Sequence, residues 1–119
     1  MKKINFLFFI AFISCKNDIE SIKSGQELYI SHACNVCHSL DGSRMIGPSF
    51  KNIYNKEIEF NDGSKRFVND NYLIESILEP SLKIVKGYPD LMGSYKNILS
   101  QIEIDSLVAF IERQTNYEK

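Results

Sequence analysis

Two cysteines and a histidine lie within one short stretch, Cys34, Asn35, Val36, Cys37 and His38. This Cys-x-x-Cys-His pattern is typical of a site where haem is attached covalently. Two thiols one helical turn apart can each bond one vinyl group of the same porphyrin, and the next imidazole then points at the iron. We therefore interpret Cys34 and Cys37 as thioether anchors and His38 as the proximal axial ligand.

Two other kinds of site use closely spaced cysteines. A redox pair of the thioredoxin type belongs at the end of a strand in a β-α-β pattern, which the sequence around Cys34 does not show. A zinc site needs further ligands, and outside the motif the chain has one more cysteine, Cys15, and one more histidine, His32. Both alternatives stay open here, but the pattern favours haem.

Length and charge limit the kind of protein. The chain of 119 residues is long enough for one small domain, with 44% hydrophobic residues. Because a chain this short builds a modest core, a buried macrocycle would supply much of the apolar surface. The net charge is −1 and no basic cluster of the kind that binds nucleic acid is present. We expect a monomer that depends on its cofactor and binds no nucleic acid.

The N-terminus is typical of a secretory signal peptide. A basic start at Lys2 and Lys3 precedes residues 4–13, an apolar run interrupted by Asn5 and too short to span a bilayer. The run ends in Phe-Ile-Ser-Cys, which resembles the lipobox of bacterial lipoproteins. This predicts that Cys15 is lipidated and becomes the mature N-terminus; the alternative is an ordinary signal peptide with an incidental cysteine.

The chain accordingly divides into three parts. Residues 1–14 form the signal peptide of lipoprotein type, residues 15–23 a lipid-anchored polar tether, and residues 24–119 the folded domain. We expect an exported protein held on the periplasmic side of a bacterial membrane.

Hydrophobic spacing predicts three main helices. The first begins at residue 24 or 25 and runs into the Cys-x-x-Cys-His motif. The second spans residues 70–79 and ends before Pro80. The third begins after a capping box of Ser100 and Glu103 and runs to about residue 114.

A short β-hairpin is predicted between the first two helices. Residues 57–60 and 65–68 alternate in polarity and flank a turn that contains Asp62 and Gly63. Since two strands alone are marginally stable, the hairpin should be an addition to a helical domain.

The loop over residues 81–97 contains Met92. A lone methionine is more often a packing residue, but a haem iron needs a donor on the face opposite His38, and this loop lies between helices. The rival Met45 follows His38 too closely in the chain to cross to that face. We therefore predict Met92 as the second axial ligand.

The same loop carries an excess of positive charge. Lys83, Lys86 and Lys96 stand against Asp90 alone. These lysines either attract an acidic partner over roughly a Debye length or form a solvated face.

Taken in order, these segments resemble the class I cytochromes c. The hairpin and the approach to the methionine through Lys86, Gly87 and Tyr88 look most like the cytochrome c domain of cytochrome oxidase subunit II. The resemblance implies an all-α cytochrome c fold, with three main helices and a small β-hairpin insertion around one covalently bound haem c. It also implies that the carbonyl of Pro48 contacts the axial histidine. Gly25 is either a close-approach residue between the first and last helices, as in that family, or a cap.

The function implied is one-electron transfer rather than enzyme catalysis. The partners would be redox proteins such as a terminal oxidase or a quinol-oxidising complex in a respiratory chain. The alternatives are a haem-based sensor or small-ligand-binding module with a labile methionine, and a structural subunit of a larger respiratory complex. Gly93 stands where the resembling proteins usually have proline after the ligand methionine, and this favours the sensor.

Overall fold

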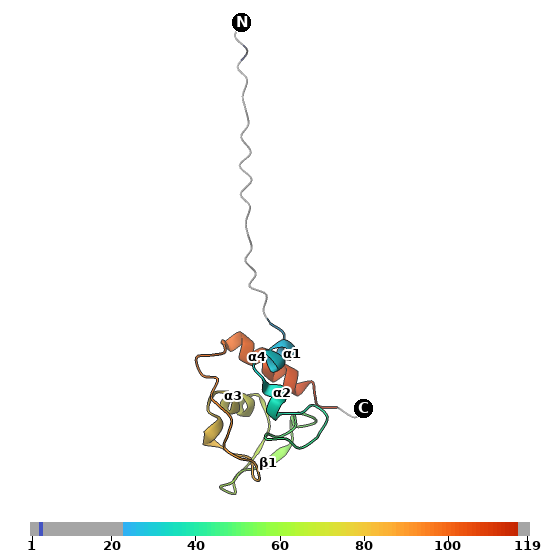
Figure 1. Cartoon of the computed structure of the whole chain (residues 1–119), viewed down its shortest axis with the longest axis vertical. Helices are drawn as coiled ribbons and strands as arrows, with labels where there is room; N and C mark the ends of the chain where they lie inside the picture. The colour runs from blue at the N-terminus through green and yellow to red at the C-terminus, as the bar shows by residue number, and fades with distance from the viewer. Residues whose placement is uncertain (1–2, 4–22, 117–119) are drawn as a thin grey trace.

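The structure is a computed structural model that describes Lys3 and residues 23–116. In this part of the chain, helix α1 lies beside α4, and the sheet lies away from that pair (Figure 1). The elements are α1 (Gly25–Ser31), α2 (Cys34–Cys37), β1 (Glu57–Glu59), β2 (Lys65–Phe67), α3 (Asp70–Leu78), the 3₁₀ helix η1 (Pro80–Leu82) and α4 (Gln101–Glu112). The predicted helical domain with a small hairpin is confirmed, and α2 is a further short helix.

Helices α1 and α4 cross in close contact. Each begins with a capping box, formed by Ser24 with Glu27 and by Ser100 with Glu103. Gly25 is buried, and a Cβ at this position would lie 2.5 Å from the Cβ of Phe110. Since Ser24 is the N-cap, Gly25 is the close-approach residue and the cap alternative is wrong.

The sequence predicts that the first helix runs unbroken into the Cys-x-x-Cys-His motif, and this prediction is wrong. Helix α1 ends at Ser31, and Ala33 adopts a left-handed conformation with φ of 57° before α2 begins. The hydroxyl of Tyr95 donates a hydrogen bond to the carbonyl oxygen of His32 at 2.9 Å. This distant tyrosine therefore stabilises the break between α1 and α2.

The hairpin and α3 follow their predictions closely. Strands β1 and β2 are antiparallel, with Glu57 opposite Phe67, and each ends one residue earlier than expected. The side chain of Asn69 caps α3. Helix α3 ends at Leu78, before Pro80 as predicted and one residue earlier than expected, and Pro80 begins η1.

The core lies between α1, α3, α4 and the hairpin. Its largest fully buried side chains are Phe60, Leu28 and Val68. Phe60 lies 5.7 Å from Tyr72 between ring centroids, so the end of the hairpin packs on α3. The hairpin thus belongs to the core as well as to the surface.

The N-terminal predictions lie largely outside the described residues. The signal peptide (residues 1–14, except Lys3), Cys15 and the tether (residues 15–23, except Lys23) are among them. Within the part of the chain that the structure describes, no helix has the length and apolar character needed to cross a membrane.

Candidate functional site

Helix α2 brings both thiols and the imidazole to one wall of a cavity. Cys34, Cys37 and His38 all line it and are half-buried. The backbone amide of His38 donates a hydrogen bond to the carbonyl oxygen of Cys34 at 2.9 Å, so the last turn of α2 fixes the backbone position of the histidine. We call this side, which also includes Gly47 and Pro48, the proximal wall.

The ring of His38 is oriented by Pro48. Its Nδ1 lies 2.7 Å from the carbonyl oxygen of Pro48. Because a carbonyl oxygen only accepts hydrogen bonds, Nδ1 carries the proton, and Nε2 keeps a free lone pair. The contact expected from the family resemblance is therefore present, and it prepares Nε2 to bind a metal.

Three further residues hold this histidine in place. The ring of Phe50 stacks on the imidazole, with centroids 4.6 Å apart and an interplanar angle of 17°. Gly47 passes so close to the ring that a Cβ would lie 2.7 Å from Nδ1. The hydroxyl of Tyr29 donates to the carbonyl oxygen of His38 at 2.5 Å. The sequence pattern predicts none of these roles for Phe50, Gly47 or Tyr29.

Burial sets the protonation of the site. It lowers the pKa of the His38 imidazole, against an opposing effect of the hydrogen bond to Pro48. Burial also raises the pKa of the Cys34 thiol. A neutral imidazole is the form that can donate a lone pair to a metal.

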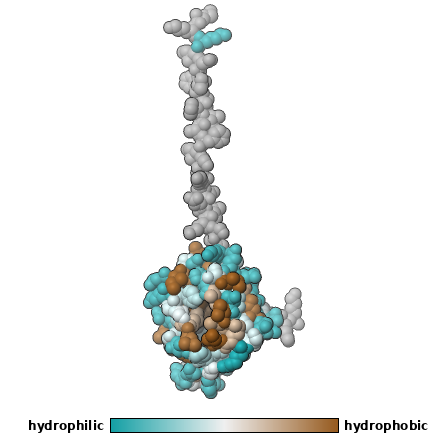
Figure 2. Space-filling view, viewed as in Figure 1, coloured by the Kyte–Doolittle hydropathy of each residue, from teal (hydrophilic) through white to brown (hydrophobic). Residues whose placement is uncertain are grey.

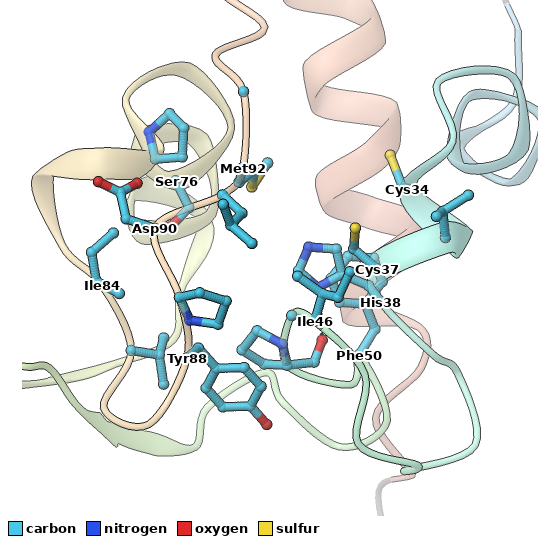
Figure 3. A pocket seen from close by; sticks show the side chains of 18 of the residues that line it. Cys34, Cys37, His38, Ile46, Phe50, Ser76, Ile84, Tyr88, Asp90 and Met92 are labelled. Carbon is cyan, nitrogen blue, oxygen red and sulfur yellow. Dashed lines mark hydrogen bonds between the residues drawn. The ribbon is translucent and has the colours of Figure 1, made fainter.

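The opposite side, which we call the distal wall, contains Met92. Leu91, Met92 and Gly93 line the cavity together with residues of α3. Figure 3 shows Met92 across the cavity from Cys37 and His38. Met45 does not line the cavity, so the structure brings Met92 and not its rival to the site.

The cavity between the two walls has a volume of about 400 Å³. A smaller cavity of about 30 Å³ lies deeper, where Leu107 and Ile111 of α4 meet Cys34, His38 and Met92. The walls of the larger cavity are mostly apolar, with a few polar groups. Cavities of this size and character bind cofactor-sized molecules.

The zinc and thioredoxin alternatives find little support. Among the described residues, no three His, Cys, Asp or Glu side chains form a group that could hold a metal ion. The cysteine pair follows a helix, and the sheet is an antiparallel hairpin rather than part of a β-α-β unit.

Comparison with known proteins decides the family. The family model described as cytochrome c matches residues 22–115. This chain belongs to the cytochrome c family. Its members transfer electrons and carry one covalently bound haem c, so haem is the cofactor of this protein. A stretch of 31 residues is 48% identical to cytochrome c-551 of Azotobacter vinelandii, covering 26% of this chain and 37% of that relative. The match thus spans little more than a third of the relative's length.

The site fits haem. The walls are apolar, two thiols stand at one side, and the lone pair of His38 is kept free by Pro48. Because Gly47 has no side chain, the imidazole of His38 has room beside it. These features match the needs of a flat, apolar macrocycle with an iron at its centre.

The charge around the distal wall is more balanced than the sequence indicates. Lys86 forms a salt bridge with Glu59 at 3.0 Å, and Lys96 forms one with Glu79 at 3.3 Å. Both carboxylates lie outside the loop over residues 81–97. The positive excess of this loop is therefore largely offset.

Proposed function

We propose that this protein is a one-electron carrier in which Cys34 and Cys37 hold haem through thioether bonds and His38 and Met92 are the axial ligands. The observation that carries the proposal is the hydrogen bond from His38 Nδ1 to the carbonyl oxygen of Pro48, which leaves Nε2 as the metal-binding nitrogen. When bound, haem supplies an iron that gains or loses one electron.

The residues of the site control that chemistry. Pro48 fixes the imidazole and makes it a stronger donor, while Phe50 prevents the ring from turning. Methionine is a soft ligand that favours the ferrous state and raises the reduction potential. The apolar walls keep water away from the ligands, and this acts in the same direction. Two filled axial positions suit electron transfer better than catalysis.

Partners should approach the rim of the cavity. Val36, Ile46 and Leu91 line the cavity, and 59%, 48% and 71% of their surfaces are exposed. Figure 2 shows hydrophobic patches on the face of the domain turned to the viewer. Because Lys86 and Lys96 are paired, we expect apolar contact rather than charge to dominate docking. A terminal oxidase or a quinol-oxidising complex is the class of partner we propose.

The cellular setting is also a proposal. The apolar N-terminal run and Cys15 favour export and lipid anchoring on the periplasmic side of a bacterial membrane. The residues between the anchor and α1 would hold the domain near the membrane surface, as a monomer. The hairpin and the approach to Met92 favour a relative of the cytochrome c domain of oxidase subunit II.

One observation favours a second function, small-ligand binding. Met92 is 37% exposed, and among the described residues beyond its two chain neighbours no heavy atom lies within 4 Å of the position a Cβ would take at Gly93. A loosely held methionine could leave the iron to carbon monoxide or a similar molecule.

The test is substitution of Met92. Met92→Ala should convert a six-coordinate low-spin optical spectrum to a high-spin or water-ligated one, lower the reduction potential and open the iron to carbon monoxide. The matched control Met45→Ala should leave all three unchanged. An unaltered spectrum in Met92→Ala would refute the ligand assignment, and rapid carbon monoxide binding by the unmutated ferrous protein would favour the sensor.

A further inference from the structure

Arg44 joins the two walls of the cavity. It follows His38 in the chain, and its Nη2 donates a hydrogen bond to the carbonyl oxygen of Gly87 at 2.5 Å. The same guanidinium lies over the ring of Tyr88, with Cζ 4.3 Å from the centroid. Gly87 and Tyr88 begin the stretch that leads to Met92, so one side chain of the proximal half contacts the distal ligand segment twice.

Several polar contacts of residues 90–95 hold the segment around Met92 to the distal wall. The hydroxyl of Ser94 and the amide of Tyr95 donate to carbonyl oxygens in the last turn of α3. Asp90 accepts a hydrogen bond from the hydroxyl of Ser81 in η1 at 2.8 Å. The hydroxyl of Tyr95 also donates to the carbonyl oxygen of His32, which precedes α2. For residues 87–92 themselves, the link to the segment that follows the proximal histidine is the side chain of Arg44.

We propose that Arg44 is a positioning residue that holds residues 87–92 against the proximal wall and thereby keeps Met92 at the iron. This inference rests on the proposed ligation by Met92. The guanidinium suits the role because it is planar, and it can stack on an aromatic ring while it donates hydrogen bonds. A small molecule can replace the methionine only when the stretch opens, and opening breaks both arginine contacts.

The experiment compares Arg44→Ala with the wild-type ferric holoprotein in two measurements. Amide hydrogen exchange over residues 87–93 should become faster, because the stretch loses its tie to the proximal wall. Imidazole should replace the methionine about tenfold faster, the effect of losing one charge-assisted hydrogen bond and one cation–π contact. Arg44→Lys should give exchange and imidazole-binding rates between those of Arg44→Ala and the wild type. Tyr88→Phe, which keeps the aromatic ring, should give the wild-type rates.

Lys56→Ala is the control, because Lys56 is an exposed basic residue that does not line the cavity. It should behave as the wild type in both measurements. Unchanged exchange in Arg44→Ala would overturn the proposal, and so would faster exchange with an unchanged imidazole rate. The spectrum of Met92→Ala separates these results from failure of the ligand assignment: if it does not change, both proposals fall, and if it changes as expected, only the role of Arg44 is at stake.

Discussion

At the site, the environment of His38 comes from residues that approach it from different directions. Pro48 accepts from Nδ1, Phe50 stacks on the ring, and Tyr29 binds the backbone carbonyl. The sequence predicts the Pro48 contact because a Gly-Pro pair after the haem motif resembles a known family. It does not predict the other two, because an aromatic residue in a hydrophobic pattern can pack against many partners.

Gly47 offers a test at this scale. Its φ is not positive, so alanine is compatible with the backbone, and the effect of Gly47→Ala would be purely steric. The added methyl group would displace the imidazole and weaken the bond to Pro48. We expect a loss of about 1–3 kcal/mol in the free energy of unfolding, measured by urea denaturation of the holoprotein, together with an altered reduction potential. Gly93→Ala, with open space around it, should change the stability little; equal effects of the two substitutions would argue against a tight histidine pocket.

Among the elements, the capped helices were predictable and the break between α1 and α2 was not. The capping boxes of α1 and α4 depend on residues close together in the sequence. The break depends on Ala33, a strong helix former held in a left-handed conformation, and on a hydrogen bond from the distant Tyr95. Local propensity favours a continuous helix here, and tertiary contacts override it.

The close crossing of α1 and α4 can be tested by a substitution at Gly25. Gly25→Ala would place a methyl group against the backbone carbonyl of Ser106 and the Cβ of Phe110, neither of which can rotate away. The helices must then separate. We expect this to cost about 1–3 kcal/mol of unfolding free energy. Thermal and urea denaturation of the holoprotein provide the measurement.

Gln26→Ala, an exposed change in the same helix, serves as the control and should change stability by much less. If Gly25→Ala were as stable as the wild type, the close crossing would be wrong.

In the molecule as a whole, the domain encloses a cavity between the proximal and distal walls, and this cavity suits haem. The proximal wall comes from the segment around α2, and the distal wall from α3 and the Met92 loop. The order of these parts along the chain was predictable from motifs. The width of the cavity and the link through Arg44 were not, because they depend on how distant segments pack.

Peptide mass spectrometry can show whether haem is attached covalently at Cys34 and Cys37. The protein would be extracted with acid and organic solvent, which removes non-covalent haem, then digested and analysed. We predict that the peptide containing residues 34–38 carries the mass of one haem, and that Cys34→Ala combined with Cys37→Ala abolishes this. A wild-type peptide with two unmodified thiols, or haem recovered in the organic phase, would rule out thioether attachment at these cysteines.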